Sequence, residues 1–365
     1  MSFHPLFTAY PLEDYRAHQS EIAAALHSVL ERGHYILGGE VTAFEEEFAA
    51  WVGARHAIGV ANGTDAIELL LRGLGVGRGD AVAVPSHTAV ASVSAIARAG
   101  ATPVFLDVDA ATFTITPASL QQALEQPRTE KIKAVLAVHL YGHPADLPAL
   151  QALCDAHVVT LLEDCAQAHG ATWHGRKVGS LARGAAFSFY PTKNLGAIGD
   201  GGAITTSDDL LAERIREIRQ YGWRERYISA VEGVNSRLDE MQAAILRVKL
   251  RALDTRNANR RKLAALYTEG LANLSTVKPP LAKPGCEHAY HLYVIRLPQR
   301  DALMKQLLAA GIPVALHYPA AVHQQPAYAT VTHGSLAETE TLVAEILSLP
   351  LHPFLSEEAV ALALD

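Results

Sequence analysis

Residues 133–170 read KAVLAVHLYGHPADLPALQALCDAHVVTLLEDCAQAHG, and the order of apolar and amphipathic runs in this stretch decides the fold. The run at 133–140 is almost continuously apolar, as is the run at 158–164, which indicates two strands buried on both faces. Between them, residues 144–157 have the spacing of an amphipathic helix. A strand, a helix and a second strand in this order predict parallel strands joined by a helix.

The same alternation extends in both directions from this unit. Upstream, three short apolar runs are each followed by a helical pattern, and downstream two more predicted strands flank a short glycine-rich turn. The predicted strands are 56–61, 81–85, 102–108, 185–190 and 201–206, and the predicted helices are 64–75, 89–100, 117–126, 208–221 and 238 to about 270. We therefore predict an α/β domain whose mainly parallel sheet is flanked by helices on both faces.

The character of the sequence changes after Pro279 and Pro280. From there the pattern predicts a strand at 288–297, a helix at 300–311, a strand at 313–319 and a helix at 335–350. Such alternation predicts a smaller α+β domain at the C-terminus. We therefore expect a large domain at 1–250 and a small domain at 251–365, and the predicted N-terminal helix at about 12–33 is a candidate to pack with the small domain.

Composition excludes several classes of protein. Hydrophobic residues make up 49% of the chain and charged residues 19%, which excludes an extended disordered protein. The formal net charge of −7 argues against a basic nucleic-acid binder, although a local basic pocket for a phosphorylated small molecule stays possible. The three scattered cysteines lack CxxC spacing, which argues against a disulfide scaffold or a cysteine zinc site and fits a reducing cytoplasm.

The N-terminus and the apolar runs bear on membrane association. Residues 1–18 have neither a basic start followed by an apolar run nor a small-residue cleavage site, so no signal peptide is predicted. The longest apolar stretch, about 81–106, is interrupted by prolines, an arginine and other polar residues. Because a bilayer-spanning helix needs about 20 apolar residues in a row, we expect a cytoplasmic protein with no membrane and no nucleic-acid partner.

Two residues at the ends of predicted strands suggest the chemistry. Asp164 ends the strand at 158–164, and open α/β sheets bind ligands beyond the carboxyl ends of their strands. Lys193 follows the strand at 185–190, in a turn whose proline and glycines constrain the backbone. Pyridoxal phosphate needs a lysine for its Schiff base and a carboxylate that keeps its pyridine nitrogen protonated, so that the ring can accept electrons. Taken alone, each residue could also be an ordinary strand-end carboxylate or surface lysine.

The phosphate of such a cofactor needs a site of its own. Asn62, Gly63 and Thr64 lie between a predicted strand and a predicted helix, where free N–H groups and the helix dipole favour an anion. The same motif is also typical of a turn with a helix cap. Ser188 offers a further hydroxyl. The chain lacks GxGxxG after its first strand and lacks GxxxxGK[ST], so dinucleotide and P-loop sites lose their main support.

Metal and hydrolase chemistry find little support in the sequence. His139 and His143 have i, i+4 spacing, but a neighbouring glycine and proline place them at a strand end instead of on a helix. The sequence has no HExxH motif and no acidic cluster beside these histidines, so we expect no metal site. The GxSxG motif of many serine hydrolases is also absent from it.

Motifs along nearly the whole chain together resemble the DegT/StrS-type sugar-nucleotide aminotransferases, which are fold-type-I pyridoxal phosphate enzymes. One motif alone would be weak evidence, but the ordered set is specific. The stretches around Lys193 and after Gly233 resemble the branch that aminates C-3 of the sugar. The motifs are GHYILGGEVTAFEEEFA, GVANGTDAI, PSHTAVA, DVDAATFTI, VHLYGHPAD, EDCAQAHGA, FSFYPTKNLGAIGDGGAI, GVNSRLDEMQAAIL, GIPVALHYP and SLPLHPFLS.

The resemblance implies a role for each candidate residue. Lys193 and Asp164 are the catalytic pair, at the Schiff base and at the pyridine nitrogen. The implied cofactor-binding residues are Gln167 beside the ring hydroxyl, Gly63, Thr64 and Ser188 at the phosphate, and Asn235, which reaches the phosphate from the neighbouring subunit of a homodimer with shared sites. The candidates for substrate binding are His317, Tyr318, Tyr35 and Tyr190.

One position departs from the pattern of the family. An aromatic residue commonly stacks on the cofactor ring, whereas the matching residue in PSHTAVA is Ala89. Either Ala89 packs flat against the ring or the neighbouring His87 takes part. An ordinary histidine at a strand end is the alternative for His87.

The implied reaction is amino transfer from L-glutamate to a keto-sugar attached to a nucleotide, with C-3 of a dTDP-3-keto-6-deoxyhexose as the expected site. Lys193, once freed, is then the general base and acid of the proton shift. The alternatives are amination of a 4-keto sugar nucleotide, amination of a keto-inositol, and a cofactor-binding regulator without turnover. A sugar dehydratase on the same scaffold has histidine in place of the Schiff-base lysine, so the presence of Lys193 favours amino transfer.

Overall fold

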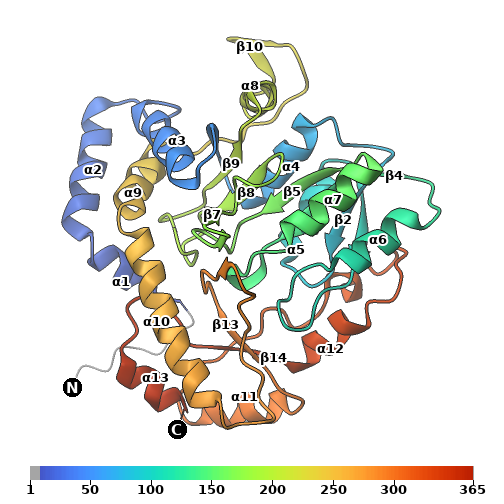
Figure 1. Ribbon diagram of the computed structural model, residues 1–365. Coiled ribbons are helices and arrows are strands. Elements are labelled where there is room, and N and C mark those ends of the chain that lie inside the picture. The colour runs from blue at the N-terminus through green and yellow to red at the C-terminus, as the bar shows by residue number, and fades with distance from the viewer. Residues whose placement is uncertain (1–8, 365) are drawn as a thin grey trace.

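The computed structural model describes residues 9–364, and Figure 1 shows their α/β architecture. Within these residues a seven-stranded sheet has the order β1-β9-β8-β5-β4-β2-β3. Neighbouring strands from β8 to β3 pair in parallel, whereas β9 is antiparallel to both β8 and β1, so the predicted mainly parallel sheet is confirmed. The strands are β1 (His56–Val60), β2 (Asp80–Pro85), β3 (Thr102–Leu106), β4 (Lys131–Val138), β5 (Thr160–Asp164), β8 (Ala185–Ser188) and β9 (Gly202–Thr206).

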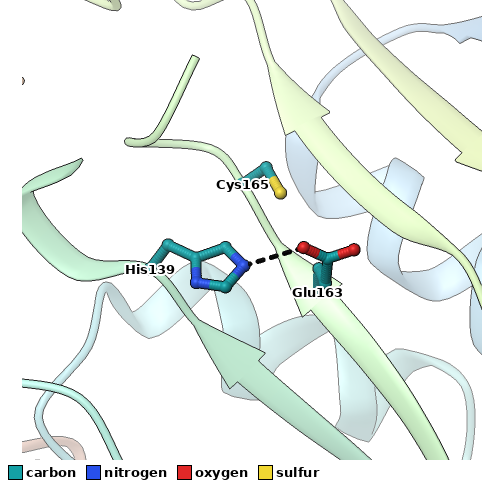
Figure 2. A group of neighbouring side chains, drawn as sticks. All are labelled: His139, Glu163 and Cys165. Atoms are coloured by element: carbon teal, nitrogen blue, oxygen red, sulfur yellow. Dashed lines mark hydrogen bonds and ion pairs between the residues drawn. The ribbon is translucent and has the colours of Figure 1, made fainter. Parts of the chain in front are cut away.

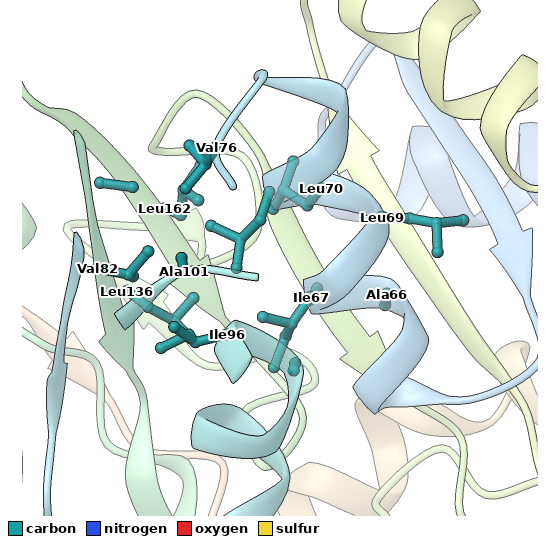
Figure 3. Close-up of a cluster of buried hydrophobic side chains, with 14 of the residues drawn as sticks. Ala66, Ile67, Leu69, Leu70, Val76, Val82, Ile96, Ala101, Leu136 and Leu162 are labelled. Atoms are coloured by element: carbon teal, nitrogen blue, oxygen red, sulfur yellow. The ribbon is translucent and has the colours of Figure 1, made fainter. Parts of the chain in front are cut away.

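Helices cover both faces of this sheet. They include α4 (Gly63–Gly73), α5 (Val90–Arg98), α6 (Pro117–Glu125), α7 (Leu147–His157) and α8 (Asp209–Ile218). Successive residues of a strand point to opposite faces. Accordingly, Val82 and Val84 of β2 pack in a cluster with α4, α5 and α8, part of which Figure 3 shows. Ala81 and Ala83 belong to the cluster on the other face, with α6 and α7.

A second group of helices packs beside β1, β8 and β9 and along the N-terminal side of the molecule (Figure 1). The group comprises α1 (Pro11–Arg16), α2 (Gln19–Arg32), α3 (Gly39–Val52), α9 (Glu240–Leu250) and the start of α10 (Leu253–Leu271), whose later buried residues pack with the C-terminal part. Ile22 of α2 packs against Ile245 of α9, and Asp14 of α1 forms an ion pair with Arg256 of α10. The single helix predicted from 238 to about 270 is two helices in the structure, α9 and α10. The division of the chain at residue 250 stays a prediction.

The C-terminal part contains a smaller α+β arrangement. In it β13 (Tyr293–Arg296) pairs antiparallel with β14 (Ile346–Leu349), beside α11 (Arg300–Ala309), α12 (Ala337–Glu345) and α13 (Glu357–Leu364). The helix predicted over 335–350 is wrong beyond Glu345, because the buried residues of β14 pair with β13 and this pairing outweighs the helical pattern. The strand predicted over 313–319 is also wrong. Among the described residues this stretch, with a proline at each end, makes one bridge, from Ala315 to Ser348.

Shorter elements complete the described secondary structure. The strands β10 (Trp223–Glu225) and β11 (Ile228–Ser229) form a hairpin, which projects from the body of the molecule in Figure 1. The strands β6 (Thr172–Trp173), β7 (Arg176–Lys177) and β12 (Cys286–Glu287) form a small sheet, and single 3-10 turns cover Leu140–Gly142 and Val322–Gln324. No helix within residues 9–364 combines the length and the apolar composition that a membrane crossing requires.

Candidate active site

A cavity of about 250 Å³ lies where the carboxyl ends of β2, β4, β5 and β8 meet the N-terminus of α4. Open α/β sheets bind their ligands at this edge. Thr88 and Ser92, which the sequence analysis did not single out, also line this cavity. The cavity brings together many of the candidate residues, namely Gly63, Thr64, Ala89, Asp164, Gln167, Ser188, Tyr190 and Lys193.

Asp164 is the last residue of β5 and is held in one orientation. One carboxylate oxygen accepts a hydrogen bond from the Ser92 hydroxyl at 2.8 Å, and the other accepts one from the Ala166 N–H at 3.0 Å. Ser92 in turn lies 3.1 Å from the Thr88 hydroxyl. Asp164 is only 4% exposed, yet it lines the cavity. A buried carboxylate with these two donors presents a fixed negative charge to whatever occupies the site.

Lys193 lies in the turn that follows β8, where its N–H donates to the Tyr190 carbonyl at 2.8 Å. The next residue holds this turn in place, since the Asn194 amide donates to Asn257 Oδ1 at 2.9 Å and to the Ala289 carbonyl at 3.0 Å. Burial lowers the pKa of Lys193 to about 8, while the negative charge of Asp164 acts in the opposite direction. A lysine with this pKa exchanges its proton near neutral pH.

The N-terminus of α4 forms a cradle for an anion. Asn62 caps the helix by accepting from the Asp65 N–H at 2.8 Å. Gly63 and Thr64 are the first two residues of the helix, so their N–H groups have no partner within it. A Cβ atom on Gly63 would lie 2.6 Å from Cβ of Ser188, so glycine is required for the close approach of the two chain segments. Two N–H groups, a hydroxyl and a helix dipole therefore point to a phosphate site.

Gln167 has a defined amide orientation. Its Oε1 accepts from the Tyr141 N–H at 2.8 Å, and its Nε2 donates to the Tyr318 hydroxyl at 3.0 Å. Because the backbone N–H can only donate, the amide oxygen must face Tyr141. The amide nitrogen carries a second hydrogen, which Gln167 can donate to an oxygen of a ligand in the cavity.

Several candidates lie outside the lining of this cavity. His87 is buried, with its Nε2 2.9 Å from the Tyr141 hydroxyl, and burial lowers its pKa to about 4. His317 lies 2.8 Å from the Ser348 hydroxyl, and burial lowers its pKa to about 4 as well. Of the two alternatives for the ring face, Ala89 lines the cavity and His87 does not.

Two further candidates lie on another surface. Tyr35 lines a hollow of about 840 Å³ that the β10–β11 hairpin borders. Asn235 is exposed and forms a β-bridge with Gln220, at the base of this hairpin. Neither residue lines the cavity beside Asp164 within the part of the chain that the structure describes.

The structure also brings three potential metal ligands together: His139, Glu163 and Cys165 (Figure 2). His139 Nδ1 accepts from the Ala145 N–H at 2.9 Å, so its Nε2 carries the proton and donates to Glu163 at 3.1 Å. Backbone N–H groups of residues 179–182 supply three further hydrogen bonds to Glu163. Burial raises the pKa of the Cys165 thiol well above its usual value. These hydrogen bonds occupy the lone pairs that a metal would need. They connect Glu163 of β5 to His139 and to the backbone of residues 179–182, so the group stabilises the packing of these segments.

The arrangement around the cavity fits pyridoxal phosphate. The cofactor needs an amine, a carboxylate and an anion site around one pocket. Lys193, Asp164 and the cradle at Gly63 provide these three groups in one cavity of about 250 Å³. Sequence reasoning missed the supports of the site, Ser92 and Tyr141, because each acts on a residue far away in the chain. A hydroxyl one turn into a helix and a tyrosine before a glycine give no local signal of such a role.

Comparison with known proteins agrees with this chemistry. The model of the DegT/DnrJ/EryC1/StrS aminotransferase family matches residues 16–363. The chain is 49% identical, over 343 residues and 93% of each chain, to the erythromycin biosynthesis sensory transduction protein EryC1 of Saccharopolyspora erythraea. It is 47% identical, over 353 residues, to the dTDP-3-amino-3,4,6-trideoxy-alpha-D-glucose transaminase of Streptomyces venezuelae, with 96% of this chain and 92% of the relative covered.

A solved structure extends the agreement to the fold. The crystal structure of DesV from S. venezuelae in complex with a ketimine intermediate has a TM-score of 0.94 and 45% identity to this chain, and the match covers 99% of this chain and 96% of that one. Nearly full-length matches in sequence and in structure agree with the fold and cofactor that the cavity implies, those of a pyridoxal phosphate-dependent aminotransferase. The chain belongs to the DegT/DnrJ/EryC1/StrS aminotransferase family.

Proposed function

We propose that the protein transfers the amino group of L-glutamate to C-3 of a keto-sugar linked to a nucleotide, with a dTDP-3-keto-6-deoxyhexose as the substrate. The observation that carries the proposal is the convergence of Lys193, Asp164 and the anion cradle in one cavity. The choice of a dTDP sugar and of C-3 draws on the S. venezuelae relative, whose name describes that chemistry. Free, unpaired cysteines at three positions support a reducing compartment, so we place the reaction in the cytoplasm.

The side chains of the cavity have separate roles in this reaction. The bound cofactor supplies an electron sink for the carbanion that forms when the amino acid loses its α-proton. Asp164 holds the proton on the pyridine nitrogen, and the hydrogen bonds from Ser92 and Ala166 keep its carboxylate in place. Lys193 Nζ takes and returns the proton that moves during the transfer, a task suited to a pKa of about 8. The N-terminus of α4 holds the phosphate.

A cofactor-binding regulator is the candidate from another class, because one relative is named as a sensory transduction protein. A binder without turnover could use the anion cradle and the Schiff base of a lysine, but it has no need of a buried carboxylate on the pyridine nitrogen beside a lysine that exchanges its proton near neutral pH. The presence of both groups supports an enzyme. Lys193 also supports amino transfer over sugar dehydration.

The test is product analysis with purified protein, L-glutamate and a panel of keto-sugars. The panel contains dTDP-linked 3-keto- and 4-keto-6-deoxyhexoses, their UDP analogues and a keto-inositol. We expect 2-oxoglutarate and a 3-amino sugar from the dTDP 3-keto compound. Amination of a 4-keto sugar or of the keto-inositol alone would contradict the substrate proposal, and cofactor binding with no product from any of them would favour the regulator.

We further propose a homodimer whose two active sites are shared between the subunits. An exposed apolar patch supports the interface: Tyr227 and Ile228 of the β10–β11 hairpin are 72% and 60% exposed, close to Tyr35 in the bordering hollow. Patches of this kind commonly mark protein interfaces. Asn235 is exposed and, within the described residues, does not line the cavity of its own chain. We infer that Asn235 reaches the phosphate in the partner's site.

Mixing two inactive variants tests this shared site. In a heterodimer of Lys193→Ala and Asn235→Asp subunits, one site carries both changes and the other carries neither. A 1:1 mixture after subunit exchange should therefore recover about a quarter of the wild-type activity, since about half of its dimers are mixed. Mixtures shown to contain heterodimer but lacking activity would contradict the role of Asn235 across the interface.

A further inference from the structure

Tyr141 lies at the junction of the active site and the C-terminal α+β arrangement. It follows β4 in the turn Leu140–Gly142 and is 1% exposed. Its backbone has φ 58° and ψ 0°, in the left-handed region that residues other than glycine seldom adopt. Such a conformation persists where the surroundings determine it from several sides.

The backbone of Tyr141 joins two segments. Its N–H donates to Gln167 Oε1 at 2.8 Å, which fixes the orientation of that amide. Its carbonyl accepts from the Leu292 N–H at 3.3 Å, immediately before β13. The left-handed conformation aims these two groups at a residue of the cavity and at the small C-terminal sheet.

The side chain of Tyr141 joins two more segments. Its hydroxyl donates to the carbonyl of His317 and lies 2.9 Å from His87 Nε2. The carbonyl can only accept, so His87 must be the donor in the second contact. The lowered pKa of His87, about 4, keeps this imidazole neutral with its proton on Nε2. The ring of Phe113 packs edge-on against the Tyr141 ring, with the two ring centroids 5.1 Å apart, and restricts the orientation of the tyrosine ring.

These contacts connect Gln167, which lines the cavity, with the segment of His317 and Tyr318. Gln167, oriented by the backbone of Tyr141, donates to the Tyr318 hydroxyl at 3.0 Å, and Tyr318 follows the residue whose carbonyl Tyr141 holds. Because Tyr318 accepts this bond, its own hydrogen is left for an oxygen of a ligand. Burial raises the pKa of Tyr318 to about 12, so the hydroxyl keeps that hydrogen at neutral pH.

We propose that Tyr141 is a positioning residue, which locks the segment of His317 and Tyr318 onto Gln167 so that the Tyr318 hydroxyl meets the keto-sugar at a fixed place. The inference rests on the proposed function for the identity of the sugar. Among the described residues neither Tyr141 nor Tyr318 lines the cavity, but the Tyr318 hydroxyl is bonded to Gln167, which does line it, so Tyr141 acts through Tyr318. Lys193 and Asp164 make no contact with its hydroxyl, and the glutamate step is therefore expected to depend on it little.

The first test measures the position of the segment without measuring activity. Tyr141→Phe keeps the ring and the backbone N–H but removes the hydroxyl, and hydrogen–deuterium exchange is compared in the holoenzymes. The matched control is Tyr293→Phe, another buried tyrosine, whose hydroxyl bonds Thr268 at 2.9 Å and which does not line the cavity. We expect the backbone amides of peptide 312–319 to exchange about ten-fold faster in Tyr141→Phe than in the wild type, and at the wild-type rate in the control. Equal exchange in wild type and Tyr141→Phe would overturn the proposal.

The second test separates the two half-reactions by single-turnover absorbance, with L-glutamate and then with a dTDP-linked 3-keto-6-deoxyhexose. Tyr141→Phe should lower kcat/KM for the sugar about ten-fold and the glutamate step by less than about two-fold. If Tyr141 acts through Tyr318, the Tyr141→Phe/Tyr318→Phe enzyme should be about as impaired as Tyr318→Phe alone. Equal losses in both steps, or losses that multiply, contradict the proposal.

Two further outcomes can be distinguished from the results of these two tests. If Tyr141→Phe proves too unstable to assay, Tyr318→Phe alone must still show the defect confined to the sugar step, and a defect in the glutamate step instead would overturn the proposal. If wild-type enzyme completes the glutamate step but not the sugar step, the proposed substrate is wrong. The exchange measurement then still decides whether Tyr141 holds the segment.

Discussion

The pH dependence of cofactor capture tests the electrostatics of the site directly. Lys193 must lose its proton before Nζ can attack the aldehyde of pyridoxal phosphate. With a pKa of about 8, about 9% of this lysine is neutral at pH 7 and about 91% at pH 9, so the rate of capture should rise about ten-fold between them. A lysine with the ordinary pKa of about 10.4 would give a rise of about one hundred-fold.

The Asp164→Asn variant changes this profile in a defined direction. The Asn oxygen can still accept from the Ala166 N–H, and its NH₂ can donate to Ser92, whose hydrogen then turns to Thr88. The local structure should therefore survive. The negative charge that raises the pKa of Lys193 is lost, so its midpoint should fall below the wild-type value. The variant is expected to capture the cofactor faster at pH 7, yet to turn over poorly, because the pyridine nitrogen loses its anionic partner.

The assay is stopped-flow absorbance of apoenzyme mixed with pyridoxal phosphate from pH 6.5 to pH 9.5, with Lys193→Ala as the blank. Ionisation of the free cofactor affects the wild type and Asp164→Asn equally, so it cancels in the ratio of their capture rates. A one hundred-fold rise for the wild type would show that Lys193 is not desolvated. An unchanged or higher midpoint in Asp164→Asn would show that the charge of Asp164 does not act on Lys193. Near-normal turnover of Asp164→Asn would show that Asp164 is an ordinary strand-end carboxylate in the wild type.

Three further predictions concern single residues. Wild-type protein loaded with cofactor should bleach on addition of L-glutamate and become labelled on borohydride reduction, and a Lys193→Ala protein that still becomes labelled would refute the assignment. Gly63→Ala should weaken cofactor binding by about ten-fold or more in a fluorescence titration, because the new Cβ displaces Ser188, whereas Gly39→Ala, with no atom within 4 Å of its Cβ, should bind normally. Glu163→Gln, which puts an NH₂ group among hydrogen-bond donors, should lower the free energy of unfolding in urea by about 2–4 kcal/mol, while exposed Glu47→Gln should change it little.

The sheet and the central residues of the site could be predicted because their signals are local. Continuous apolar runs separated by helical patterns specify parallel strands, and parallel strands place their carboxyl ends at one edge. Asp164 at the end of β5, Lys193 after β8 and Gly63 after β1 therefore had to approach one another once the strand order was set. The positions of these three residues follow from the fold as a whole and from no single motif.

The C-terminal errors have a different cause. Residues 335–350 keep an apolar pattern that a helix and a buried strand share, so periodicity could not show that the helix ends at Glu345. The strand β14 forms there because β13 lies in position to pair with it, and that partner is about fifty residues earlier in the chain. Burial decided between two structures that the local sequence allows.

Tyr141 shows why the supports of the site escape sequence reasoning. Its partners Gln167 and His317 lie 26 and 176 residues away in the chain, and the motif around it, HLYGHP, indicates a turn and nothing more. The left-handed backbone is costly for a tyrosine, and it exists because contacts from both directions require it. A residue of this kind is recognised when its N–H, carbonyl and hydroxyl are each traced to a separate segment. The residues that touch a ligand can be found from strand ends, whereas those that hold them in place are found from the hydrogen bonds of the folded chain.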